Sequence, residues 1–123
     1  MFFLGVRWLG PDLSFFAELE SRQAARTPGQ MAAWGGGKRQ AIAERIAAHL
    51  HKGLRWPTAV FLPEDSWQVI CNGPKFDLLE NFVAADAIAD FEDHYGVKVR
   101  RDFWENRDEA TFGDIVDGLA LLA

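Results

Sequence analysis

The residue types that could carry chemistry are few in this chain of 123 residues, and they are scattered. His49 and His51 are two residues apart, which puts them on different faces of a helix, and no Cys pair or His-Glu-x-x-His motif accompanies them. The one cysteine, Cys71, sits in an apolar run with no base beside it, as a small buried hydrophobe does. The sequence therefore predicts no metal centre and no activated thiol.

Other catalytic patterns are also missing. None of the three serines lies in a nucleophile motif such as Gly-x-Ser-x-Gly. The run from Gly35 to Lys38 lacks the earlier glycine and the following Ser or Thr of a phosphate-binding loop. We therefore expect a protein that is not an enzyme and that uses no cofactor.

Charge is the strongest chemical signal. Residues 1–63 carry eight Lys/Arg and four Asp/Glu, whereas residues 64–123 carry five and fourteen. An acidic C-terminal half repels phosphate backbones and attracts basic protein surfaces. Within it, Asp86, Asp90 and Asp93 recur at i, i+4 and i+7. This pattern predicts either a recognition face for a basic partner or an ordinary solvated helix face.

Five tryptophans fall near predicted loops or element ends, where they can plug a small core. One or two could instead be exposed anchors of a binding surface, because Trp is favoured at interaction hot spots. Trp34, beside the glycine run, and Trp104, followed by Glu105, are the best candidates.

Four stretches show the apolar period of amphipathic helices and would position these residues: 12–26, 38–52, 78–95 and 111–122. Asp12 or Ser14 can cap the first, and Gly53 and Gly96 are placed to stop the second and third. Thr111 with Asp114 approximates a capping box for the last.

The segments between these helices carry further signals. Residues 54–66 are too apolar for a loose loop and should pack across the helices, and residues 66–71 should form a short helix or strand. For the 78–95 helix, the stripe expected to face the core comprises Leu78, Phe82, Ala85, Ala89, Phe91 or Glu92, and Tyr95, with Val83 and Ile88 at its edges.

Neither a membrane span nor a signal peptide is predicted, and a single cysteine fits a reducing, cytoplasmic setting. We expect the apolar first ten residues to form instead a short buried strand or the start of a helix.

Residues 38–122 resemble an acyl-carrier-protein-like helical domain. The resemblance rests on the stretch from Phe91 to Val99, on the Thr-hydrophobic-x-Asp-hydrophobic-Val start of the last helix, and on a long structured loop between the first two helices. It implies that a serine ten residues before Phe91 would carry phosphopantetheine, but Asn81 stands there, and an amide cannot form that phosphodiester.

We therefore expect a mainly α fold: an acyl-carrier-like bundle over residues 38–123, with residues 1–37 as an N-terminal extension packing on it and one or two short strands at most.

The function expected first is a non-enzymatic protein-binding module, such as an immunity or inhibitor protein for a basic bacterial toxin. Its partner-binding residues would be Asp86, Asp90, Asp93, Trp104 and Glu105. In carrier proteins the corresponding helix recognises partners. The alternatives are an unconventional carrier modified at Ser66 and a small-ligand binder, and the oligomeric state stays open.

Overall fold

Helices dominate the computed structural model, which describes residues 14–73 and 82–123. In chain order the elements are α1 (Ser14–Ala24), the 3₁₀ helix η2 (Pro28–Trp34), α2 (Gly37–Leu54), α3 (Trp67–Asn72), α4 (Phe82–Tyr95), the 3₁₀ helix η4 (Arg101–Trp104) and α5 (Phe112–Leu122). The predicted mainly α fold is confirmed. The described residues contain no strand and only one isolated bridge, between Ser66 and Thr111.

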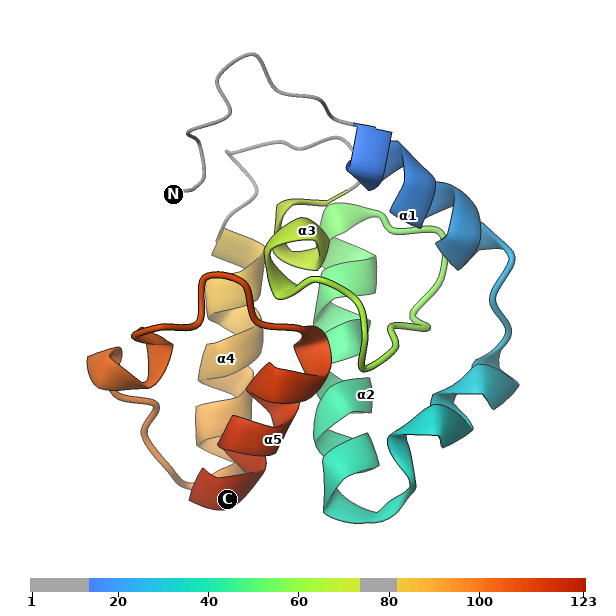
Figure 1. Ribbon diagram of the computed structural model, residues 1–123. Helices are drawn as coiled ribbons and strands as arrows, with labels where there is room; N and C mark the ends of the chain where they lie inside the picture. The colour runs from blue at the N-terminus through green and yellow to red at the C-terminus, as the bar shows by residue number, and fades with distance from the viewer. Residues whose placement is uncertain (1–13, 74–81) are drawn as a thin grey trace.

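Helix α2 is the centre of the molecule, and α4 and α5 pack along it (Figure 1). Its predicted apolar stripe is confirmed, because Ile42, Ile46 and Leu50 are all buried. Helices α1 and η2 lie on one side of α2, and α4 and η4 lie on the other. Buried side chains of α1 and η2 belong to the same core cluster as those of α2, α4 and α5.

The connection from α2 to α3 is ordered and apolar, as predicted, with Trp56, Val60 and Phe61 buried. A buried ion pair fixes it to the end of α1: the Arg26 guanidinium donates to both carboxylate oxygens of Asp65, at 2.7 and 2.8 Å. Since the two side chains are only 7% and 3% exposed, the pair is sheltered from water and holds the connection in place.

Trp34 belongs to the core rather than to the surface. It is 1% exposed, and its indole Nε1 donates to the carbonyl of Phe61 at 2.8 Å. The alternative that it anchors a partner is therefore wrong. The glycines that follow Trp34 end the 3₁₀ helix, with Gly35 at φ 86°.

The predicted core stripe of α4 is wrong in part: Phe91 and Tyr95 face the core as expected, whereas Phe82, Ala85 and Ala89 are exposed. Ala87 and Phe91 are the buried residues of α4, and Phe82 is 76% exposed. Four more side chains of α4 pack partly buried against the core: Val83, Ala84, Ile88 and Tyr95. The helix is thus rotated about its axis relative to the expectation, with the predicted edge residues facing inward. Leu78 lies outside the described residues.

Gly53 explains part of this orientation. It does not stop α2, which continues to Leu54 and closes at Arg55 in the left-handed region (φ 63°). A Cβ at Gly53 would lie 2.5 Å from Cγ1 of Val83, closer than two carbon atoms can approach. The glycine therefore lets the first turn of α4 press its Val83 side against α2.

Two predicted helix boundaries are confirmed. Gly96, at φ 66°, ends α4. Thr111 and Asp114 form a reciprocal capping box at α5, each side chain accepting a backbone N–H of the other residue at 3.1 Å. None of the helices in the described ranges is both long and apolar enough to cross a bilayer.

Candidate functional site

Helix α4 carries apolar side chains on two faces, and only one of them is buried. The second face, here called the outer stripe, consists of Phe82, Ala85 and Ala89 at i, i+3 and i+7, and all three are exposed. A helix that only had to cover the core would carry polar residues there. The outer stripe is therefore available for contact with another molecule.

An apolar groove of about 470 Å³ lies beside the outer stripe, between α3, α4 and η4. Its walls are Trp67, Cys71, Ala84, Ala85, Ile88, Ala89, Glu92 and Trp104. Ala85 and Ala89 belong both to the outer stripe and to the groove, so the two form one continuous apolar surface. Its volume falls in the range of pockets that accept small molecules or large side chains, roughly 300–1,000 Å³.

Stacked rings fix the tryptophan wall of the groove. Trp104 stacks on Trp67 with ring centroids 6.1 Å apart and planes at 14°, and Trp67 stacks in turn on Phe112, at 5.9 Å and 19°. Phe112 is fully buried. The stack therefore connects the half-buried Trp104 to the core, and the wall is formed before anything binds.

Polar contacts fix the chain on both sides of η4. The Glu92 carboxylate accepts a hydrogen bond from the backbone N–H of Val99 at 2.7 Å, which ties the chain leaving α4 back to that helix. At the far end of η4, Arg107 donates to the carbonyl of Phe103 and lies over its ring, 4.2 Å from the centroid. Glu92 is thus a structural acid as well as part of the groove wall.

The three predicted aspartates of α4 do not act together. Asp90 faces α2, where Arg45 donates two hydrogen bonds to its carboxylate, at 2.6 and 3.2 Å, and His49 lies 3.4 Å away. The Arg45 hydrogen bond is the main reason why the pKa of Asp90 is lowered from its ordinary value. Asp90 therefore joins α2 to α4.

Asp86 and Asp93, here called the outer carboxylates, are exposed and form no salt bridge with any residue that the structure describes. They lie beside the outer stripe, on the opposite side of it from the groove. Glu105 is also exposed, just after η4. Outer stripe, groove and outer carboxylates together form what is called the binding face below.

Among the described residues, those with catalytic potential do not converge. Cys71 is half-buried in the groove wall, and burial raises the pKa of its thiol well above the usual value, which disfavours the nucleophilic thiolate. The Ser66 hydroxyl accepts from the backbone N–H of Val69 at 3.4 Å and caps α3. In residues 14–73 and 82–123, no group of three or more His, Cys, Asp or Glu is placed to hold a metal ion. Asn81 lies outside the described residues.

Of the residues predicted to bind a partner, Asp86, Asp93 and Glu105 are exposed and Trp104 lies in the groove wall, but the groove itself was not predicted. Its walls come from three elements far apart in the chain, with Trp67 and Ile88 as central members. The one available signal was the crowding of tryptophans at element ends.

No protein-family model matches this chain, and neither does any curated protein or any solved structure. A proposal of its function therefore rests on the chain's own residues.

Proposed function

We propose that this protein is a non-catalytic protein-binding module whose binding face docks a partner with a basic surface. The observation that carries the proposal is the outer stripe of α4. A side chain as large as Phe82 is 76% exposed, in line with Ala85 and Ala89 and next to a groove walled by stacked tryptophans. Continuous apolar surface of this kind is typical of interaction sites.

Charge supports a basic partner. The outer carboxylates border the apolar surface, and no described residue neutralises them. The segment 64–123, which supplies most of the binding face, has fourteen acidic and five basic residues. An apolar centre with a charged rim is the usual arrangement of an interface, in which the rim sets the encounter rate and the choice of partner.

Resemblance to acyl-carrier domains agrees with this proposal, since α4 corresponds to the helix through which those domains are recognised. A carrier role would need an attachment serine, and Asn81 occupies that position in the sequence. A binding module needs no such serine.

The test is a pull-down with the tagged full chain from a lysate of the source cells, read by quantitative mass spectrometry. Ala89→Arg adds a bulky charge in the middle of the binding face. Ala17→Arg is the matched control, because Ala17 is an exposed alanine of α1, on the other side of the molecule. Asp86→Lys/Asp93→Lys tests the charge.

We expect one stoichiometric basic partner that the Ala17→Arg variant retains and the other two variants lose. If all three variants capture the same proteins as the native chain, the binding face is not where the partner docks and the proposal fails.

A further inference from the structure

We infer that the segment that occupies the binding face is a basic amphipathic helix lying along α4, with an apolar flank in the groove and a cationic flank on the outer carboxylates. This inference rests on the proposed function and names the class of partner. Three features support it: the shape of the binding face, the spacing of its charges, and the symmetry that a contact between two copies of this chain would have.

Shape favours a helix over an extended segment. An extended peptide that binds by strand addition needs the edge of a sheet, and the described residues contain no sheet. The binding face is instead the side of a helix, whose backbone groups are already bonded within α4. Ala85 and Ala89 are one turn apart and small, so a second helix can approach to the short end of the usual interaxial range, about 8 Å.

The spacing of the charges predicts the pattern of the partner. Asp86 and Asp93 are seven residues apart, about 10 Å along the helix axis. Asp90 lies between them in sequence but is engaged by Arg45. A partner helix parallel or antiparallel to α4 would meet both outer carboxylates with Lys or Arg at i and i+7. One or two large apolar residues between them would fill the groove.

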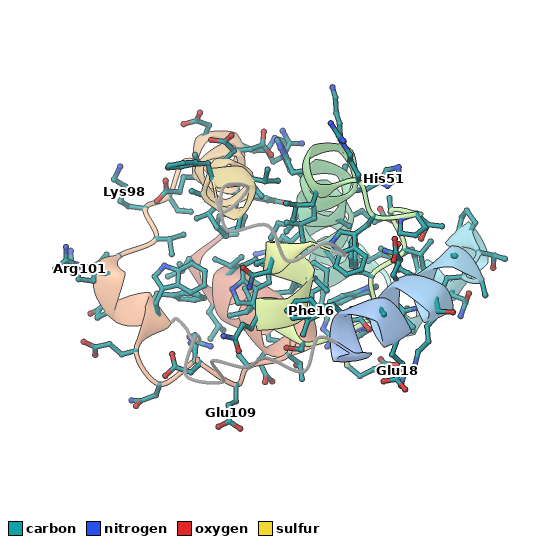
Figure 2. All side chains as sticks on the ribbon, turned by 90° about the horizontal axis from the view of Figure 1, so that it is seen from above. Phe16, Glu18, His51, Lys98, Arg101 and Glu109 are labelled. Carbon is teal, nitrogen blue, oxygen red and sulfur yellow. The ribbon has the colours of Figure 1, made fainter. Side chains whose placement is uncertain are left out.

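Symmetry argues against a second copy of this chain as the occupant. In a two-fold antiparallel contact centred near Ala89, Asp86 of each copy would face Asp93 of the other. In a parallel contact the outer carboxylates of one copy would lie over the groove side of the other copy, where Glu92 forms part of the wall. Both arrangements place like charges together beside apolar surface, which is unfavourable. Lys98 and Arg101 follow the end of α4 and point away from the body of the molecule (Figure 2), so they do not lie between the outer carboxylates on that helix.

The probe is a pair of displayed peptide libraries of equal length, one on a helical scaffold and one of proline-containing extended peptides. Both are panned against the full native chain and against Asp86→Lys/Asp93→Lys. Selected peptides are then synthesised, and their affinities are measured for the native chain, Ala89→Arg and the Ala17→Arg control. Circular dichroism of each variant checks that it is folded.

We expect the helical library to enrich peptides with Lys or Arg at i and i+7 flanking bulky apolar residues. Their affinity should fall by about tenfold or more in Ala89→Arg, stay unchanged in Ala17→Arg and weaken with added salt. Panning against the charge-reversed variant should enrich Asp or Glu at the same two positions.

Three results would overturn the inference. Extended peptides that bind the native chain but not Ala89→Arg would show that the partner segment is not a helix, while leaving the proposed function intact. Light scattering that shows a dimer of the native chain abolished by Ala89→Arg would make a second copy the occupant. A failure of both libraries to yield any binder sensitive to Ala89→Arg would also overturn it, and the pull-down would then judge the proposed function separately.

Discussion

The two phenylalanines of α4 offer a sharp test of which face of the helix is buried. Phe91 is 0% exposed and packs its ring 5.0 Å from that of Tyr95, so Phe91→Ala leaves a cavity in the core. Such replacements cost about 3–5 kcal/mol, a large part of the roughly 5–15 kcal/mol that stabilises a domain.

Phe82 is the matched case in the same helix. With 76% of its surface exposed, it has lost only a quarter of the contact area of a phenylalanine. A quarter of about 200 Å² at about 25 cal/mol per Å² gives about 1 kcal/mol as an upper limit for Phe82→Ala. The two identical substitutions should therefore differ by at least about 2 kcal/mol.

Urea unfolding, followed by far-ultraviolet circular dichroism and by tryptophan fluorescence, measures both costs. Phe91→Leu, which removes less volume, replaces Phe91→Ala if that variant does not fold. If Phe82→Ala lowered the free energy of unfolding as much as Phe91→Ala, or more, the outer stripe would be buried. That result would refute the assignment of buried and exposed faces of α4.

Three further predictions concern polar groups. Asp65→Ala should lower the free energy of unfolding by about 3–5 kcal/mol in urea titrations, because it leaves the Arg26 guanidinium buried and unpaired; a cost below about 1 kcal/mol would mean that water reaches the pair. Asp90→Asn should cost up to about 1 kcal/mol near neutral pH. Because the folded pKa of Asp90 is lowered by Arg45, this stabilisation is full above the ordinary carboxyl pKa and is lost as pH falls through the lowered value. The difference between native and Asp90→Asn stabilities should hence vanish in acid, and a constant difference would contradict the ion pair. Cys71 should react slowly with a thiol reagent in the folded chain near neutral pH and at the ordinary rate in denaturant, whereas equal rates would show an unburied thiol.

Local signals in the sequence were enough to place most of the helices. The four-residue recurrence of Ile42, Ile46 and Leu50 has only one amphipathic solution, and the structure buries that side of α2. Thr111 with Asp114, and the glycine at 96, are boundary signals that depend on neighbouring backbone alone, so they could be read without tertiary structure.

The orientation of α4 could not be read in this way. Its apolar residues satisfy the helical period twice, once through Phe82, Ala85 and Ala89 and once through Ile88 and Phe91. Alanine contributes too little to decide between these solutions, so contacts with α2 decide instead. These contacts depend on the close approach of Val83 to Gly53, and Gly53 lies far from α4 in the sequence.

The candidate site was harder to predict because its parts are distant in sequence. Arg45 and Asp90 are separated by 45 residues, so their ion pair could not be foreseen from the acidic spacing alone. The groove likewise needs Trp67 and Trp104 to meet, which depends on how η4 is held against α3 and α4.

The most direct test of the central claim is methyl NMR of the full chain with labelled alanines, titrated with the partner captured in the pull-down. The methyl groups of Ala85 and Ala89 should shift or broaden in proportion to bound partner, while that of Ala17, on the other side of the molecule, should stay in place. Saturable binding that perturbs Ala17 and leaves Ala85 and Ala89 unchanged would contradict the claim that α4 presents its second apolar face to a partner.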